Sequence, residues 1–531
     1  MTMVRKTPRR QCDQENVCRG DHNLPADARK LAFGSALRLG NTVATALVSV
    51  LIMPFVVHTL GDRMYGVWTL VGTFIGYYGV LELGLSNAVS RYLAKSLGAG
   101  DEEDCNRIFN TSLRLYLGLG TVAFLISALI AAMASWLCGN TQDAYLFSRI
   151  ILILGLSIGL MFPVKVFKGA LEGHMRFEIT AGLDLLSLLL RTALIVPVLL
   201  AGYGILGLAW VTFLTSLPSV ALHIYFTHKH LPFLRFDSRY WGRSTARLLL
   251  SYSAFSLIAQ LADILQFRLD AFVVAGFVGV AAVTHYKIAG VLTQYFFDLM
   301  SALMGVLPSI FSRQDGAQKY EALQNTFFFA SKLAVCIASF IGFALIAWGK
   351  VFIWRWMGPQ YDDAYPILLI LVLGCTVALW QGPSISLLYG TSRHKVFALF
   401  NSIEGLANLA LSLVLVRSYG MIGVALGTLI SKMVVKIFIQ PIYVCRVAGI
   451  NYLDYVGRTA RTLATVAGSL VVPMLLSVKF AAPDYRILFA LGLLSIVCYA
   501  VPLWLFEFST GETRLLQQAI WPRIVVRKGA Q

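Results

Sequence analysis

The residues of this sequence best suited to chemistry are ionisable side chains inside long apolar segments. Such groups are costly at membrane depth and usually face a cavity or a partner. The basic ones are Arg38, Arg191, Arg268, Lys287, Lys432 and Lys436, and the acidic ones are Glu82, Asp184, Asp263, Asp270, Asp298 and Glu404. Because the two signs balance, total charge does not by itself predict a cationic cavity.

Helical spacing places several polar residues in two matched stripes. The first contains Asp184, Ser187 and Arg191, and the second, 217 positions later, contains Asn401, Glu404 and Asn408. Residues at i, i+3 and i+7 share one helix face. A matched pair of stripes favours a cavity between two repeated units, which makes these residues candidates for substrate binding. Hydrogen bonds between neighbouring helices are the alternative use of the same residues.

Four further residues are candidates for contact with an anionic substrate. Lys432 and Lys436 share one helix face, and Lys432 lies deep in its apolar segment. A diphosphate requires cationic donors of this kind, although snorkelling toward the membrane surface explains Lys436 equally well. Arg38 and Asn41 lie about one turn inside the first apolar segment, where Arg38 either meets phosphate or snorkels.

Carboxylates on two other predicted helices are candidates for ion coupling. Asp263 and Asp270 lie on one stripe, and Lys287 and Asp298 lie on another. We expect one of these carboxylates to bind a coupling ion, Na⁺ or H⁺, and an ion pair with Lys287 is the alternative. The sequence contains no P-loop and no HExxH motif, so we predict no enzyme activity, no cofactor and no metal site.

Composition determines the kind of element that carries these residues. The mean hydropathy is +0.71, and 13% of residues are charged, against about 25% in soluble domains. Helices are the expected spanning elements, because each satisfies its backbone hydrogen bonds internally. We count about fourteen apolar segments, which predicts an all-α integral membrane protein.

The loops between these segments predict the orientation. Lys and Arg concentrate in alternate loops and in both terminal segments, which accounts for most of the net charge of +17 without nucleic-acid binding. By the positive-inside rule, we expect a multi-pass protein of a bacterial inner membrane with both termini in the cytoplasm.

An internal repeat indicates how the segments are grouped. YGILGLAWVT begins at Tyr203 and YGMIGVALGT at Tyr419, 216 residues later. The interval spans an even number of helices, so the two copies run in the same direction, and we expect two six-helix lobes around a central cavity plus two further helices. The predicted divisions are a basic tail (1–32), an N-lobe (33–228), a basic linker (229–245), a C-lobe (246–446), two helices (447–508) and a basic tail (509–531).

The same region carries a family resemblance. The matching positions are Leu60, Gly61, Tyr65, Gly66 and Trp68, then Glu82 to Leu85, Arg91 and Tyr92, and later Asp270, Gly279 and Tyr286. In these motifs the chain resembles the prokaryotic polysaccharide and lipid-linked oligosaccharide flippases, which include O-antigen flippases. They belong to the multidrug/oligosaccharidyl-lipid/polysaccharide exporter superfamily.

The resemblance implies a flippase that moves polyprenyl-diphosphate-linked oligosaccharide from the cytoplasmic to the periplasmic leaflet by alternating access. The cargo would be an O-antigen, capsule or exopolysaccharide repeat unit, and membrane lipid and polysaccharide polymerase or assembly proteins would be partners. A drug/cation antiporter of the same superfamily is the first alternative and would favour a cavity dominated by carboxylates. A membrane glycosyl ligase or polymerase is the second, and the short loops predicted on the outer side argue against it.

Overall fold

The computed structural model describes residues 26–82, 85–134, 141–251, 269–479 and 485–507. Every regular element in these ranges is a helix. The N-terminal ones are α1 (Ala26–Leu60), α2 (Asp62–Leu81), α3 (Leu85–Ala99), α4 (Glu102–Ala132), α6 (Thr141–Gly173), α7 (Phe177–Leu200), α8 (Gly204–His230) and the short η1 (Ser238–Tyr240).

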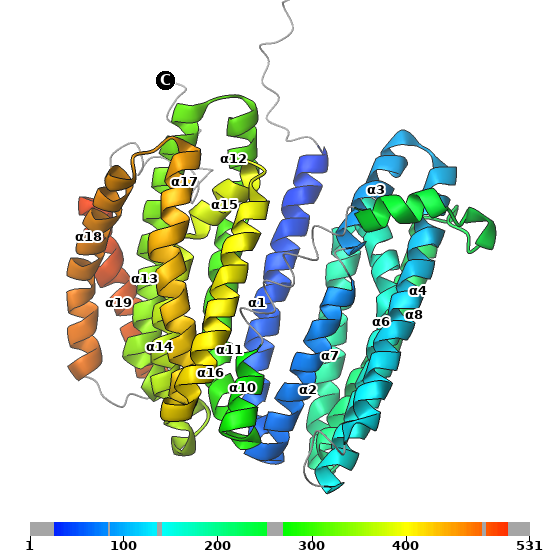
Figure 1. The fold of residues 1–531 in the computed structure, drawn as a ribbon, viewed down its shortest axis with the longest axis horizontal. Helices are drawn as coiled ribbons and strands as arrows, with labels where there is room; N and C mark the ends of the chain where they lie inside the picture. The colour runs from blue at the N-terminus through cyan, green and yellow to red at the C-terminus, as the bar shows by residue number, and fades with distance from the viewer. Residues whose placement is uncertain (1–25, 83–84, 135–140, 252–268, 480–484, 508–531) are drawn as a thin grey trace, which may run out of the picture.

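The later helices include several short pieces. They are α10 (Asp270–Phe277), α11 (Val280–Met304), α12 (Leu307–Gly316), α13 (Tyr320–Trp356), η2 (Pro359–Tyr361), α14 (Ala364–Trp380), α15 (Gly382–Gly390), α16 (His394–Met433), η3 (Val434–Ile439), α17 (Gln440–Ala448), α18 (Tyr452–Lys479) and α19 (Tyr485–Phe506). Figure 1 shows that the long helices run roughly side by side.

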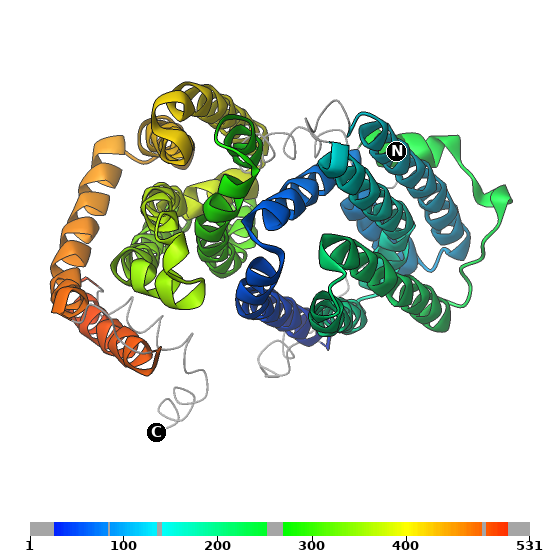
Figure 2. The ribbon, with the colours of Figure 1, turned by 90° about the horizontal axis from the view of Figure 1, so that it is seen from below.

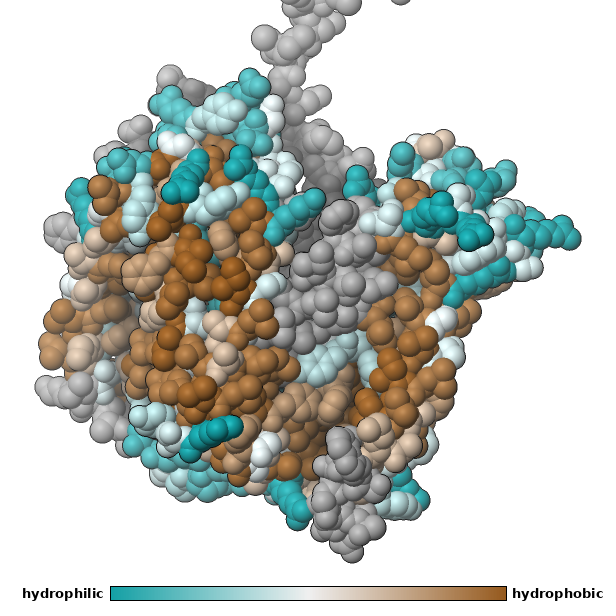
Figure 3. Space-filling model, viewed as in Figure 1, coloured by the Kyte–Doolittle hydropathy of each residue, from teal (hydrophilic) through white to brown (hydrophobic). Residues whose placement is uncertain are grey.

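The length and composition of these helices confirm an integral membrane protein. Nine helices of the described ranges are long and apolar enough to cross a membrane, or ten if the bent pair α14–α15 is one span. Figure 3 shows a broad apolar band across one face, with hydrophilic side chains toward its upper and lower ends. The total of fourteen spans stays a prediction, because the described ranges do not cover the whole chain.

The helices form two groups, which confirms the predicted pair of lobes. Figure 2 shows α1 to α8 on one side and α10 to α17 on the other, with α18 and α19 along the outer edge of the second group. The extra pair packs mainly through α18 against α13. Tyr499 donates a hydrogen bond to the Cys336 carbonyl at 2.8 Å, which ties α19 to the same helix. The exact boundaries of the predicted divisions remain predictions.

The two copies of the repeat make the same kind of turn. Gly204 opens α8 with φ 54°, and Gly420 interrupts α16 with φ 56°. Glycine adopts this left-handed region without the steric cost that other residues incur. The stretch from Lys395 to Ala448 is therefore a hairpin of two antiparallel helices.

The second glycine of each copy allows the two arms of its hairpin to approach closely. A Cβ on Gly207 would lie 2.5 Å from the Val198 side chain, and one on Gly423 would lie 2.2 Å from the Leu415 carbonyl oxygen. Neither distance is tolerable, so the motif YGxxGxA specifies both the turn and the packing beside it.

Another glycine brings the two lobes together. Helix α2 packs against α11 across the interface between the lobes. A Cβ on Gly66 would lie 2.1 Å from the Val280 carbonyl oxygen, so at this point one backbone rests directly on the other. The motif around Tyr65 and Trp68 therefore has a structural purpose at the lobe interface.

Candidate substrate cavity and ion site

A cavity of about 750 Å³ lies between α2 and the C-lobe; we call it the interlobe cavity. Its N-lobe wall includes Tyr65, Trp68, Thr69 and Thr73, and its C-lobe wall includes Asp270, Tyr286, Lys287, Thr428 and Lys432. Aromatic rings, hydroxyl groups, ammonium groups and one carboxylate thus face the same space. This combination suits a ligand with both sugar-like and anionic parts.

Asp270 anchors a buried hydrogen-bond cluster on the wall of this cavity. Tyr286 donates to Asp270 Oδ2 at 2.8 Å, and Asn408 Nδ2 donates to Oδ1 at 3.2 Å. Thr428 Oγ1 lies 3.1 Å both from Asp270 Oδ2 and from the side-chain oxygen of Asn408. Two hydroxyl groups and one amide group, from α11 and the α16 hairpin, therefore donate hydrogen bonds to one carboxylate on α10. A hard cation or a proton is the ligand that such a group attracts.

The predicted stripe on the first arm of the α16 hairpin faces the two lysines on the second. Lys432 Nζ lies 3.3 Å from Glu404 Oε1, and Lys436 Nζ lies 3.2 Å from Glu404 Oε2. Lys436 also donates to Asn401 Oδ1 at 3.3 Å and to Gln440 Oε1 at 3.0 Å. The side chain of Glu404 is fully buried, and those of the two lysines are 8% and 3% exposed. The two polar faces thus form a buried series of ion pairs and hydrogen bonds inside the C-lobe; we call Asn401, Glu404, Lys432 and Lys436 the ladder.

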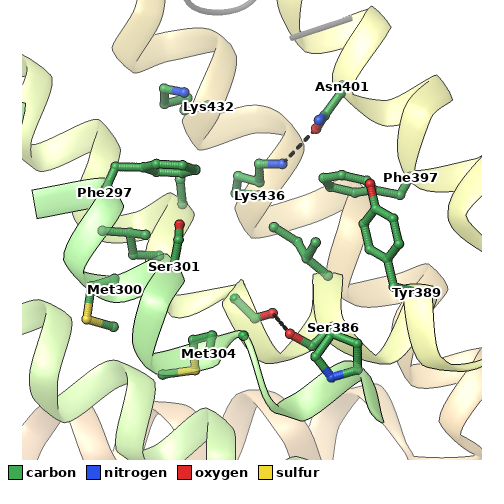
Figure 4. A pocket seen from close by; sticks show the side chains of 16 residues that line it. Phe297, Met300, Ser301, Met304, Ser386, Tyr389, Phe397, Asn401, Lys432 and Lys436 are labelled. Carbon is green, nitrogen blue, oxygen red and sulfur yellow. Dashed lines mark hydrogen bonds between the residues drawn. The ribbon is translucent and has the colours of Figure 1, made fainter. Parts of the chain in front are cut away.

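A second cavity of about 320 Å³ lies within the C-lobe; we call it the C-lobe pocket. Lys432, Lys436 and Asn401 form part of its wall, and Figure 4 shows them opposite Met304 and Ser386. Lys432 also borders the interlobe cavity. Three of the predicted substrate-binding residues therefore line this pocket. Glu404 supports the two lysines from behind, whereas Asn408 contacts Asp270 and Thr428 of the interlobe cavity.

The predicted N-lobe stripe is placed differently. Asp184 forms an ion pair with Lys168 at 2.6 Å, and Arg191 lies on an exposed part of α7. None of the described side chains lining the two cavities comes from α7. Within the N-lobe, Glu82 forms an ion pair with Lys165 and accepts a hydrogen bond from Tyr116 at 3.1 Å. In this conformation the N-lobe carboxylates Asp184 and Glu82 connect neighbouring helices.

Of the other predicted site residues, some lie outside the described residues and the rest can be placed. Asp263 and the side chain of Arg38 lie outside the described residues. Asn41 is half-buried, and among the described residues its Oδ1 has no hydrogen-bond partner. Lys287 lines the interlobe cavity. Asp298 accepts a hydrogen bond from Gln294 at 2.8 Å, one turn away on α11.

Sequence reasoning missed a polar cluster that joins the lobes where α1 turns into α2; we call Asp62, Thr284, His285, Tyr361 and Asp363 the interlobe seal. His285 Nδ1 lies 2.7 Å from Asp363 Oδ1, and its Nε2 lies 3.5 Å from Asp62 Oδ2. Tyr361 donates to Asp62 Oδ1 at 2.5 Å, and Thr284 donates to the Asp62 carbonyl at 2.7 Å. Burial, and then the hydrogen bond to Asp62, raise the pKa of Tyr361, so its hydroxyl remains a donor.

Only one kind of signal was available for the missed residues. The family-motif residues Gly61 and Tyr286 are direct neighbours of Asp62 and His285 in the sequence, and they mark this region without identifying its contacts. The seal joins residues 222 and 299 positions apart, and helical periodicity within one segment carries no information about such pairs.

The sequence of this chain is similar to those of known membrane proteins. The sequence model of the family described as polysaccharide biosynthesis protein matches residues 59–366. The "Uncharacterized membrane protein EpsK" of Bacillus subtilis (strain 168) is 23% identical over 526 residues, covering 94% of this chain and 99% of the relative. A "Putative O-antigen transporter" of Shigella flexneri is 19% identical over 409 residues, covering 75% of this chain and 94% of the relative.

Two solved structures share the fold. The lipid II flippase MurJ in an inward closed conformation superimposes with a TM-score of 0.67 at 14% identity, covering 92% of this chain and 99% of that one. An inward-facing multidrug resistance MATE family transporter of the MOP superfamily gives a TM-score of 0.66 at 18% identity, with coverage of 81% and 99%. At these identities the likeness shows the architecture alone.

Proposed function

This chain belongs to the polysaccharide biosynthesis protein family, and from that premise we propose that it is a flippase for polyprenyl-diphosphate-linked oligosaccharide. It moves an O-antigen, capsule or exopolysaccharide repeat unit from the cytoplasmic to the periplasmic leaflet of a bacterial inner membrane. Its similarity in sequence to a putative O-antigen transporter and in fold to a lipid II flippase supports this proposal. Translocation changes no covalent bond, so the proposal assigns no enzyme activity to the chain.

The composition of the interlobe cavity is the observation that carries the proposal. Trp68 supplies an aromatic face and Thr69 and Thr73 supply hydroxyl groups, which suit sugar rings. Lys287 and Lys432 supply ammonium groups on the opposite wall, and charge-assisted hydrogen bonds to phosphate oxygens are strong. Its volume lies within the range of about 300–1,000 Å³ that is typical of ligand sites.

The interlobe seal gives this cavity a closed end. The seal joins the lobes near the turn between α1 and α2, and the positive-inside rule assigns that turn to the periplasm. Substrate therefore enters from the cytoplasmic side and leaves after the seal opens. Polymerase or assembly proteins that consume the repeat unit are the expected partners on the periplasmic side.

Asp270 is the proposed site of ion coupling. Asn408 in its cluster lies one helical turn from Glu404, and Thr428 lies one turn from Lys432. An ion at Asp270 therefore acts on the neighbouring pair of Glu404 and Lys432, where charges interact strongly because the surroundings have a low dielectric constant. Na⁺ or H⁺ bound there would weaken the electrostatic attraction between Asp270 and Lys432, which leaves Glu404 as the carboxylate that competes with phosphate for the lysine.

The same carboxylate favours a second candidate function. A small cationic drug exchanged for Na⁺ or H⁺ would bind at Asp270 on the cavity wall. The two lysines on the cavity wall oppose a cationic ligand, so we place this function second.

A liposome assay separates the two functions. The purified protein is reconstituted with a labelled polyprenyl-diphosphate oligosaccharide in one leaflet, and its appearance in the other leaflet is measured with and without a Na⁺ or H⁺ gradient. Protein-dependent crossing supports the flippase, and Lys432→Ala should abolish it. Protein-free liposomes are the control, and a cationic dye is tested in parallel. Transport of the dye without transport of the lipid would replace the flippase by the antiporter.

A further inference from the structure

Three interruptions of helix geometry meet at the C-lobe pocket. Helix α11 ends at Met304 before α12 begins at Leu307, α14 and α15 meet at a 41° bend, and η3 is a π-helix that carries Lys436. Gly305, Gly382 and Lys436 from these three places all line the pocket. Irregular backbone at membrane depth is tolerated only where protein buries it or where it lines a cavity, and π-helical turns concentrate at functional sites. The three interruptions therefore mark this pocket as a candidate binding site.

The polar groups on its wall favour an anion. The ammonium group of Lys436 is held by Asn401, Gln440 and Glu404 at 3.0–3.3 Å, and that of Lys432 lies on the same wall. Helices α12 and α15 begin beside the pocket, each with a proline in its first turn. The C-terminal ends of α11 and α14 border the same pocket, so the helix dipoles largely offset one another and the positive charge of the wall comes from the lysines.

The remaining wall is apolar. Its side chains include Phe297, Met300, Met304, Leu379, Ile385 and Phe397. The volume of about 320 Å³ holds about ten water-sized groups, so a single inorganic ion would leave most of the apolar wall without contacts. Ser301 and Gly305 are exposed, and Tyr389 is 47% exposed, which places a mouth between α11 and α15. An anion with an attached apolar chain matches this shape.

We propose that the C-lobe pocket binds the phosphate-bearing end of a lipid. The phosphate lies beside Lys436 and Lys432, and the first carbons of the chain lie among Met300, Met304 and Phe397. This inference rests on the proposed flippase function and divides its substrate into two parts. Because Lys432 borders both spaces, a phosphate held there lets the chain begin in the C-lobe pocket while the glycan occupies the interlobe cavity.

Binding of a lipid without a glycan tests the inference directly. The probe is tritiated long-chain polyprenyl monophosphate, and the full-length protein is held in nanodiscs. We expect saturable binding of the labelled lipid. The corresponding polyprenol and inorganic diphosphate should each displace it at least tenfold less well than unlabelled polyprenyl monophosphate does. Equal competition by polyprenol would reduce the pocket to an apolar surface, and equal competition by diphosphate would remove any role for the chain.

Two adjacent substitutions locate the binding. Ser301→Trp places an indole in the mouth of the pocket, whereas Ala302→Trp places one at an exposed position outside its lining. We expect Ser301→Trp to weaken binding at least tenfold and Ala302→Trp to change it less than twofold. Equal effects of the two would overturn the assignment.

Photo-crosslinking keeps the test decisive if Ser301→Trp fails to fold. A photoreactive phenylalanine analogue replaces Phe397 in the pocket or, as the control, the exposed Leu399. Crosslinking of the labelled lipid at position 397 and not at 399 supports the site, and the reverse pattern contradicts it.

If the glycan-free lipid binds while the glycan lipid does not cross liposomes, the proposed function fails and the pocket stands. If the glycan lipid crosses without binding in the pocket, only the pocket assignment fails.

Discussion

At the scale of single residues, Glu404 is the carboxylate shared by two buried ammonium groups. Glu404→Gln keeps the shape and removes the charge, which leaves Lys432 and Lys436 facing each other in a low dielectric. Breaking a buried ion pair in this way typically costs about 3–5 kcal/mol. We therefore expect a large fall in the thermal unfolding temperature of the detergent-solubilised protein.

Glu103 provides the matched comparison for Glu404. It pairs with Arg107 at 2.9 Å, but its side chain is 71% exposed, and surface pairs contribute little. Glu103→Gln should leave the unfolding temperature unchanged. If Glu404→Gln behaves in the same way, the ladder is not a stabilising element.

Asp270 supports a second prediction at this scale. Asp270→Asn preserves most of the side-chain shape but removes the negative charge that would hold Na⁺ or exchange a proton. Translocation in liposomes should continue at a basal rate and lose its response to an imposed gradient. Asp454→Asn, an exposed acid at the start of α18, should keep the response. A full gradient response in Asp270→Asn would move the coupling site elsewhere.

The sequence marks Asp270 as one of four candidate residues for ion coupling and does not identify its partners. A carboxylate in an apolar segment is conspicuous because its burial is costly. Asn408 and Thr428 lie 138 and 158 positions away, and uncharged polar residues are common in membrane helices. Which of them meets Asp270 depends on how the helices pack, and the pattern within one segment does not encode it.

At the scale of elements, Gly66 determines how closely α2 and α11 pack. Gly66→Ala places a Cβ 2.1 Å from the Val280 carbonyl oxygen, and overpacking of this kind typically costs about 1–3 kcal/mol. We expect a lower unfolding temperature and a longer spin-label distance between the two helices. Gly79→Ala on the same helix meets nothing within 4 Å and should change neither quantity. An unaltered distance in Gly66→Ala would show that the contact is not required.

The repeated turns could be predicted from the sequence, whereas the pairing of polar faces could not. YGxxGxA contains glycines where the backbone requires them, at the turn and at the close approach. The Lys432–Glu404 and Lys436–Asn401 contacts require two helices to be rotated toward each other. Helical periodicity predicts which polar residues share a face but not whether that face meets a cavity or a neighbouring helix. Here the face on the first arm of α16 does both, because Asn401 lines the C-lobe pocket while Glu404 does not.

At the scale of the whole molecule, we expect the interlobe seal to control which conformation is favoured. Asp363→Asn removes one partner of His285 at 2.7 Å and should weaken the closure between the lobes. Cys375 on the wall of the interlobe cavity is a natural reporter. Its labelling by a membrane-impermeant thiol reagent applied from the periplasmic side should rise several-fold, measured by mass spectrometry.

The neighbouring residue supplies the control for this experiment. Asp362 pairs with Lys350 at 3.3 Å, and both side chains are about half exposed. Asp362→Asn removes the same charge one position away without touching His285, so labelling of Cys375 should stay at the wild-type level. Equal labelling in both variants would mean that the seal does not hold the lobes together.

The direct backbone contact at Gly66 also has a mechanical meaning. It lies near one end of α2, a helix of 20 residues and hence about 30 Å long. A contact without intervening side chains acts as a fulcrum, and the rest of the helix acts as a lever arm. The far end of the helix at Leu81 lies about 22 Å from this point, so a tilt of about 10° moves it by about 4 Å. Small adjustments at the seal are thus amplified at the opposite mouth, where we propose that the substrate enters.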